Sequence, residues 1–128
     1  MTGEEASFVC GADGSNTTSG IGKWCFFDGE EYVRGDVPHV STCNVSEYHA
    51  LINLLKHLAG KELKPGKFLI LMDSALVVNQ VNGNYRVRLD HLKPLCAEAS
   101  ELISKFHCEL QWVPRTHPLM KEIDKRSR

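Results

Sequence analysis

The sequence predicts an α/β domain in which helices pack on a mixed sheet, and three observations lead to this fold class. The N-terminal part contains three short apolar segments joined by links rich in Gly, Asp, Asn and Ser, which is typical of antiparallel hairpins. The spacing of apolar residues then changes to that of a helix. A continuous apolar run follows the helix, as expected for a strand that is buried on both faces.

Three strands and one helix are expected in the first half of the chain. The strands are residues 7–12 ("SFVCGA"), Gly20–Phe27 and residues 30–37 ("EEYVRGDV"). The helix is predicted over Asn44–Gly60, where apolar residues recur at every third or fourth position. Its first residue is expected to be the N-cap and its last to be the C′ residue, since Asn and Gly favour these positions.

Two further strands and three helices are expected in the second half. The continuous apolar run Lys67–Met72 predicts the buried strand, and Ser74–Val81 predicts a short helix that ends at "NGN". A longer helix is expected over Leu89–Phe106. Cys108–Val113 alternates as a strand does, and the tail from residue 117 is expected to begin a last helix.

Composition indicates a single globular domain. The chain has 128 residues, of which 42% are hydrophobic and 24% charged, enough for a core of its own. The formal net charge of −1 would not attract nucleic acid, so binding a polyanion would require a local basic patch or metal ions. We expect residues 1–6 to be a flexible N-terminus and residues 7–128 to form the domain. Trp24 and Trp112 lie in strand patterns and are expected in the core.

The cysteines and the N-terminus indicate the compartment. The five cysteines are odd in number and widely spaced without a Cys-x-x-Cys pair, which argues against a zinc knuckle or a redox pair. Free thiols are typical of a reducing compartment. The N-terminus lacks a signal peptide, and the longest apolar run is too short to span a membrane. We therefore expect a soluble, cytoplasmic monomer with no membrane partner.

Four carboxylates stand out, and each also has a purely structural interpretation. Glu47 is in line with the apolar stripe of its helix, but its spacing from Asn44 is that of a capping box. Asp73 follows the buried strand, where α/β sheets bind ligands, but it or Ser74 would also suit a helix N-cap. Asp13 precedes Gly14, and Asp-Gly is a common tight turn. Asp124 lies in the charged tail "KEIDKRSR", where a solvated helix face is the simpler interpretation.

The expected topology brings three of these acids together. A helical crossover joins the hairpin segment to Lys67–Met72, so the first strand and this one are expected to be parallel neighbours. Asp13 and Asp73 would then face each other, with Glu47 in reach of both. Three converging carboxylates repel each other, and divalent cations relieve that repulsion. Oxygen ligands with no Cys or His cluster suit Mg²⁺ or Mn²⁺, and two such ions can assist a phosphoryl displacement.

The order of elements and acids resembles the type 1 ribonuclease H family, especially its reverse-transcriptase-like branch. The residues that carry the resemblance are "ADGSN…SGIGKW", "CNVSEYHALINLLKHL", "LILMDSALVVNQVNGNYRVR" and "LQWVPR…EID", which together cover most of the chain. The family implies a five-stranded mixed sheet in the order 3-2-1-4-5, with the first three strands antiparallel. It also implies hydrolysis of the RNA strand of RNA–DNA hybrids with two Mg²⁺ or Mn²⁺ ions, leaving a 5′-phosphate.

The resemblance also implies roles for single residues. Asp13 would bridge the two metal ions, with Glu47, Asp73 and Asp124 completing the set. Asn44 would read a 2′-hydroxyl of the RNA strand, the group that separates RNA from DNA. Other residues expected beside the substrate are Gly14, Ser15, Asn16 and Ser74. His117 matches a histidine that helps product release in some members, although a surface loop histidine is the simpler interpretation.

The sequence departs from the family pattern in ways that leave alternatives open. Met120 replaces an Asn that commonly precedes the last acid, and Glu122 competes with Asp124 for that role. About 200° separates these two acids on a helix, so only one can face the site. No lysine-rich protrusion separates the middle helices, so we expect modest affinity for hybrids. The alternative to a nuclease is a non-catalytic member of the fold that binds nucleic acid or protein; a third possibility, ranked lower, is a nuclease domain of a larger polymerase or transposition protein.

Overall fold

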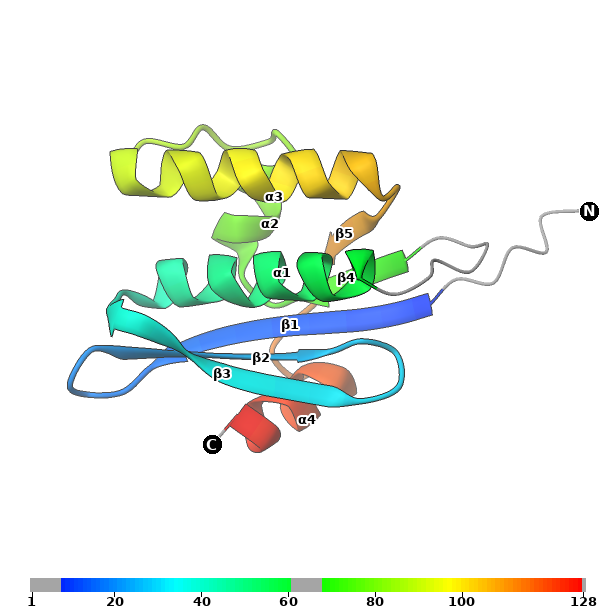
Figure 1. Cartoon of the computed structure of the whole chain (residues 1–128), viewed down its shortest axis with the longest axis horizontal. Coiled ribbons are helices and arrows are strands. Elements are labelled where there is room, and N and C mark those ends of the chain that lie inside the picture. The colour runs from blue at the N-terminus through cyan, green and yellow to red at the C-terminus, as the bar shows by residue number, and fades with distance from the viewer. Residues whose placement is uncertain (1–7, 61–67, 128) are drawn as a thin grey trace, which may run out of the picture.

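The computed structural model describes residues 8–60 and 68–127. These residues contain one five-stranded sheet in the order β3 (Tyr32–Val40), β2 (Ile21–Phe27), β1 (Phe8–Asn16), β4 (Phe68–Met72) and β5 (Glu109–Trp112). The helices α1 (Cys43–Ala59), α2 (Ala75–Val81) and α3 (Lys93–Lys105) lie on one side of the sheet, and α4 (Pro118–Ser127) lies on the other (Figure 1). The first three strands are antiparallel, and β1, β4 and β5 are parallel to one another. This order confirms the predicted fold class. Residues 1–7, Lys67 and Arg128, for which predictions were made, lie outside the described residues.

The five strands follow the apolar segments of the sequence, but β1 and β3 extend further than predicted, and β3 is Tyr32–Val40 rather than residues 30–37. Asp13 and Gly14 do not form a turn: β1 continues through them, and they pair with Cys25 and Trp24 of β2. The turn comes at residues 17–20, where the Thr17 N–H donates to the Ile21 carbonyl at 2.9 Å. The strands are β1 Phe8–Asn16, β2 Ile21–Phe27, β3 Tyr32–Val40, β4 Phe68–Met72 and β5 Glu109–Trp112.

The helices correct the predicted caps of α1. Thr42 is the N-cap, because its backbone is extended and its Oγ1 accepts from the Val45 N–H at 3.3 Å. Asn44 therefore lies inside the first turn and forms no capping box with Glu47. Gly60 ends the helix in the right-handed region, with φ −78°, rather than as a left-handed C′ residue. The helices are α1 Cys43–Ala59, α2 Ala75–Val81, the 3₁₀ turn η1 Asp90–Leu92, α3 Lys93–Lys105 and α4 Pro118–Ser127.

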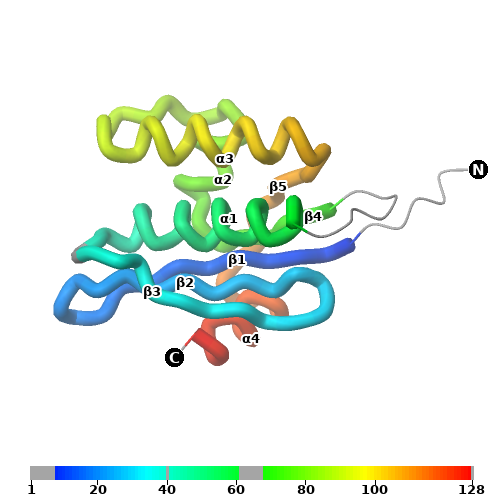
Figure 2. Tube along the Cα trace, in the orientation of Figure 1, coloured from blue at the N-terminus to red at the C-terminus, as the bar shows by residue number. Residues whose placement is uncertain are grey.

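The helix predicted over Leu89–Phe106 is divided into η1 and α3. Pro94 lies at the first turn of α3, where its missing N–H costs nothing, so the regular helix begins there. Figure 2 shows the chain passing from α2 along α3 before it returns through β5 to the far face of the sheet. No helix in residues 8–60 and 68–127 is long and apolar enough to cross a membrane.

The core has two parts, one on each face of the sheet. The larger part packs α1, α2 and α3 on the sheet, with Leu51, Leu54, Leu55 and Leu58 of α1 fully or almost fully buried. The smaller part packs Met120 and Ile123 of α4 against the other face. Trp24 packs against the larger core, but Trp112 is 47% exposed because β5 is an edge strand, so the prediction that Trp112 is a core residue is wrong. All five cysteines are free, as predicted.

Candidate active site

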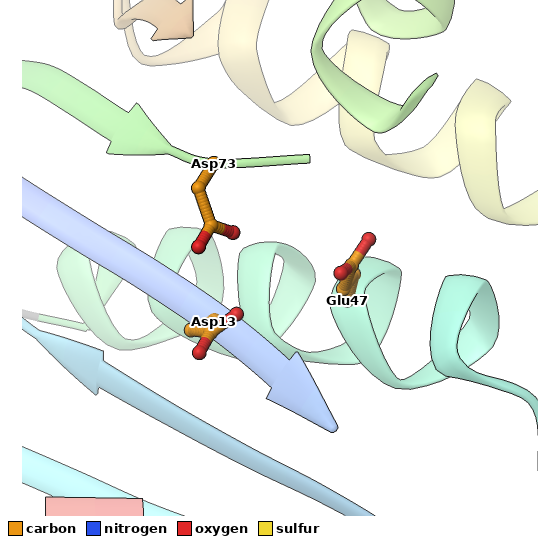
Figure 3. Close-up of side chains that lie close together, drawn as sticks. All are labelled: Asp13, Glu47 and Asp73. Atoms are coloured by element: carbon orange, nitrogen blue, oxygen red, sulfur yellow. The ribbon is translucent and has the colours of Figure 1, made fainter. Parts of the chain in front are cut away.

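Three carboxylates converge at one end of the sheet. Asp13 lies in β1, Glu47 in α1 and Asp73 directly after β4 (Figure 3). One carboxylate oxygen of each residue lies within 4.8 Å of one oxygen of the others. Within the described ranges, this is the one group of three or more acids, histidines or cysteines spaced closely enough to hold a metal ion.

Strand pairing places Asp13 beside Asp73. The parallel pairing of β1 and β4 ends at Gly11 and Leu71, and each acid follows two residues later. Since side chains alternate along a strand, both acids continue the same row at the end of the sheet. The sequence therefore sets this contact through the lengths of the two apolar runs.

Close backbone packing brings Glu47 to the same place. Gly14 of β1 lies directly under the first turns of α1, and a Cβ atom at this position would lie 2.3 Å from the Glu47 backbone nitrogen. Any larger residue would push α1 away from β1. The Asp-Gly pair thus supplies one ligand and the room for the helix that carries another.

The competing cap interpretations of Asp73 are resolved by its neighbour. Ser74 is the N-cap of α2, and its Oγ accepts from the Val77 N–H at 3.2 Å. The Ser74 hydroxyl also donates to the Glu47 carboxylate, which lowers the pKa of Glu47 against the effect of burial. The Asp73 carboxylate is therefore not needed as the cap of α2.

Burial, joined by the charges of neighbouring acids, raises the pKa values of the three carboxylates. Burial is the largest cause at Asp13, followed by the charges of Asp73, Glu47 and Asp124, and together they raise its pKa to about 8. Burial raises the pKa of Glu47 to about 7, opposed by Ser74 and Arg115. Burial also raises the pKa of Asp73, opposed by Arg115. Without a cation, this site would hold protons at neutral pH.

The fourth acid lines a cavity of about 310 Å³ beside the three. Asp124 lines this cavity and Glu122 does not; Glu122 pairs with Arg126 at 2.7 Å. Asp124 is not part of the group whose oxygens lie within 4.8 Å of one another, but its charge contributes to the raised pKa of Asp13. The residues that line the cavity are Asp13, Asp73, Arg115, Thr116, Met120, Lys121 and Asp124.

Two cations line the same cavity, and sequence reasoning did not single them out. Arg115 follows β5 and comes to the edge where Asp73 follows β4. Lys121 lies on α4, one turn before Asp124. Arg115 could have been found from "WVPR", since this segment ends a strand beside the one that ends at Asp73. Both side chains suit an anionic group bound next to the acids.

The residues predicted to contact substrate differ in their burial and in the hydrogen bonds that they form within the protein. Asn16 donates from its amide to the Ser41 carbonyl and accepts from the Ser46 hydroxyl at 2.6 Å, so it fixes the segment before α1. Ser15 is half-buried in β1, opposite Lys23. Asn44 is half-buried in the first turn of α1. Gly14 and Ser74 are buried, and both pack against or bind Glu47.

His117 lies at the start of α4. Its Nδ1 accepts from the Leu119 N–H at 3.1 Å, and its carbonyl accepts from the Lys121 N–H at 3.0 Å. It is not among the described residues that line the cavity next to Asp13. These contacts give it a role in starting α4.

The donor set of the site fits hard divalent cations. The converging groups are carboxylates, and no Cys or His belongs to the group. Mg²⁺ and Mn²⁺ prefer oxygen ligands, and their charge would offset the repulsion that raises the pKa values. The residues present therefore suit such ions.

A second concavity of about 440 Å³ lies beside the segment between α2 and η1, and it too was missed. Tyr85, Arg86 and Arg88 line it, and Tyr85 is 49% exposed. Gln80 also lines this concavity, and its side chain accepts from the Tyr48 hydroxyl at 2.7 Å. Tyr48 directly follows Glu47 in α1. The signal in the sequence is "NYRVR", two arginines beside an aromatic residue.

This sheet order, with acids at the ends of the two central strands and on the crossover helix, defines a ribonuclease H-like protein. The sequence model of the "Reverse transcriptase-like" family matches residues 25–120. The chain belongs to this family.

Solved structures show the same fold. The N-terminal ribonuclease H domain of Rv2228c from Mycobacterium tuberculosis is 25% identical, with a TM-score of 0.73 over 95% of this chain and 99% of that chain. LC11-RNase H1, isolated from compost, is 25% identical with a TM-score of 0.79 over 91% and 89% of the two chains. Ribonuclease H1 from Halobacterium salinarum has a TM-score of 0.76 at 22% identity, over 94% and 93%.

One curated relative is the "Bifunctional protein Rv2228c" of Mycobacterium tuberculosis. It is 38% identical over 76 residues, which are 59% of this chain. The match spans 20% of that protein's length, so it concerns one part of a longer relative.

Proposed function

We propose that the protein is a metal-dependent endoribonuclease that hydrolyses the RNA strand of RNA–DNA hybrids. The observation that carries the proposal is the convergence of Asp13, Glu47 and Asp73 within 4.8 Å, beside a cavity that Asp124 also lines. LC11-RNase H1 has also been solved in complex with an RNA/DNA hybrid, on the same fold with a TM-score of 0.69. Fold and acids together therefore favour this chemistry.

In this proposal Asp13, Glu47, Asp73 and Asp124 would hold two Mg²⁺ or Mn²⁺ ions. Bound ions of this kind activate water and stabilise the leaving oxygen of a phosphodiester. The carboxylates must release protons to bind them, because the pKa values of Asp13 and Glu47 are about 8 and about 7 without metal. We expect products with a 5′-phosphate and a 3′-hydroxyl.

The cations of the cavity would hold the phosphate to be cleaved. Arg115 and Lys121 line the cavity together with Asp13 and Asp124. An anion bound there would contact the two cations and lie next to the acids. Charged hydrogen bonds from Arg to phosphate are among the strong ones. Their role is to fix the phosphate while the carboxylates hold the ions.

Recognition of RNA is assigned to the first turn of α1 and the end of β1. Asn44 would bind a 2′-hydroxyl, and Ser15, Gly14 and Ser74 would lie beside the strand. Asn16 acts indirectly in this proposal, since its bonds to Ser41 and Ser46 hold the segment that presents Asn44.

The second concavity, which Tyr85, Arg86 and Arg88 line and which we call the groove, would supply further contacts to the phosphate backbone. The chain has a net charge of −1, so its affinity for a polyanion depends on local groups of this kind. This groove replaces, on a smaller scale, the basic protrusion that the sequence lacks.

The second candidate function is a non-catalytic member of the fold that binds nucleic acid or protein. One observation favours it: Asp124 lies outside the close group of acids. The two candidates differ in one measurable property, cleavage in the presence of a divalent cation.

The test is incubation of the protein with a hybrid whose RNA strand is labelled, in Mg²⁺ or Mn²⁺, with EDTA as one control and Asp73→Asn as the control for contaminating nucleases. We expect cleavage of the RNA strand only, none of the all-DNA duplex, and none in EDTA. Binding of the hybrid without cleavage in either metal would establish the non-catalytic function instead.

A further inference from the structure

The last turn of α4 carries Asp124 but has little apolar anchorage. Met120 and Ile123 are buried, and a Cβ atom on Gly11 would lie 2.7 Å from Cδ1 of Ile123, so the first turns of α4 lie directly on β1. After Ile123, the described residues of the helix are half-buried or exposed. Apolar burial therefore holds the start of α4 but not the turn that bears Asp124 and Arg126.

Contacts with β3 and one ion pair within α4 hold this last turn instead. The Arg126 guanidinium lies 4.1 Å from the centroid of the Tyr32 ring, and its Nε donates to Glu122 at 2.7 Å. The Arg126 carbonyl accepts from Nη1 of Arg34 at 3.3 Å. The Tyr32 ring in turn packs against Phe27, with centroids 4.7 Å apart.

Helix geometry connects these contacts to the position of Asp124. Glu122 and Arg126 are four residues apart and share one flank of α4, beside Tyr32. Asp124 is two residues from each of them, about 200° around the helix, and it lines the cavity on the opposite flank. A rotation of α4 about Ile123 that releases Arg126 from Tyr32 must therefore also move the Asp124 carboxylate.

We infer that Tyr32 and Arg126 are positioning residues, which fix the rotation of the last turn of α4 and so hold Asp124 at the metal site. The inference rests on the proposed function, because it assigns Asp124 to the metal ions. A cation–π contact needs the face of an aromatic ring, so Tyr32→Phe should preserve the contact and Tyr32→Leu should not. Arg34 contributes a second contact, because its Nη1 donates to the backbone carbonyl of Arg126.

A buried thiol reports whether the last turn is seated. Cys25 is 1% exposed and lines a concavity together with Tyr32, Arg34, Lys125 and Arg126. Local opening of α4 would expose this thiol to alkylation. Cys96, which is 8% exposed in the larger core, serves as an internal reference in the same molecule.

The experiment compares Tyr32→Leu with Tyr32→Phe, which both keep an apolar side chain over Cys25. Alkylation by N-ethylmaleimide would be followed at each cysteine by peptide mass spectrometry, and Mn²⁺ binding would be measured by electron paramagnetic resonance without substrate. The matched control is Phe106→Leu, which removes another cation–π contact, at the end of α3. There, Nζ of Lys105 lies 5.6 Å from the centroid of the Phe106 ring.

We expect Tyr32→Leu to raise the alkylation rate of Cys25 about tenfold relative to Cys96, and Tyr32→Phe and Phe106→Leu to leave the ratio unchanged. We also expect Tyr32→Leu to weaken binding of the same Mn²⁺ ion that Asp124→Asn weakens, with no further loss in the double variant.

Two results would overturn the inference while leaving the nuclease proposal intact. One is an unchanged Cys25 rate in Tyr32→Leu; the other is faster alkylation with parental Mn²⁺ binding. Conversely, parental protein that binds Mn²⁺ but cuts no hybrid would refute the proposed function and not the positioning role. Parental protein that binds no Mn²⁺ would overturn both.

Discussion

Replacing Asp13 by Asn should make the metal-free protein much less sensitive to rising pH. The pKa of Asp13 is 3.8 ordinarily and about 8 in the fold, because burial and the neighbouring acids oppose its ionisation. Between these values, the folded protein holds a proton that the unfolded chain has released. The associated stability is fully present below about pH 4 and is lost as the pH rises toward 8.

The size of the effect follows from the width of this window. One proton held by the folded state alone makes the free energy of unfolding fall by at most about 1.4 kcal/mol per pH unit, or about 4 kcal/mol from about pH 5 to about pH 8. Glu47, with a pKa of about 7, contributes in the lower part of the same range. We expect Asp13→Asn to remove about 2–4 kcal/mol of this loss, since it also relieves the repulsion on the remaining acids.

Denaturation by urea in EDTA at several pH values measures the effect directly. Asp90→Asn is the matched control, because it also removes one carboxylate, but from a side chain that is 93% exposed. Added Mg²⁺ should stabilise the parent more at about pH 8 than at about pH 6, since the ion competes with protons for the carboxylates. Parallel stability curves for the parent and Asp13→Asn would refute the reasoning.

Three further predictions concern activity and binding. Asp73→Asn should abolish cleavage, measured on a labelled hybrid, while thermal unfolding shows equal or higher stability, because a charge leaves a crowded cluster; strong destabilisation would contradict this. Asp124→Asn should cost less activity than Asp73→Asn and be rescued better by Mn²⁺. Glu122→Gln should stay active, because Gln can still accept from Nε of Arg126; an inactive Glu122→Gln together with a parental Asp124→Asn would reverse this assignment. Replacing Arg86 and Arg88 together by Ala should weaken hybrid binding and reduce its salt dependence by about two counterions in a titration at several salt concentrations, whereas an unchanged salt slope would exclude this groove from the interface.

The sequence predicted the part of the site that depends on strand pairing. The apolar runs before Asp13 and Asp73 specify buried parallel neighbours, and two residues beyond the last pair their side chains meet. The stripe of α1 likewise specifies which flank carries Glu47. The sheet order was available only through the resemblance to a family, because apolar patterns show which segments are strands but not how they are arranged.

The errors arose where two residues could serve equally well or where burial depends on distant segments. Thr42 and Asn44 are both good N-caps, and only the extended backbone of Thr42, with φ −107° and ψ 164°, decides between them. Trp112 alternates like a core residue, but its strand lies at the edge of the sheet, and its indole N–H donates to the Asp73 carbonyl at 3.2 Å. Arg115 and Lys121 were missed because their cavity is formed by segments far apart in sequence.

The geometry of the site is set by backbone packing rather than by attraction among the groups that act in it. Burial and the charges of neighbouring acids oppose the ionisation of Asp13, Glu47 and Asp73, as their raised pKa values show. They are nevertheless held together, because Gly14 allows α1 to contact β1 at a distance no side chain would permit, and β1 and β4 are locked in register. The free energy of packing on both faces of the sheet offsets the cost of this cluster. A bound cation would recover that cost, so the same carboxylates that destabilise the metal-free fold would bind the metal tightly.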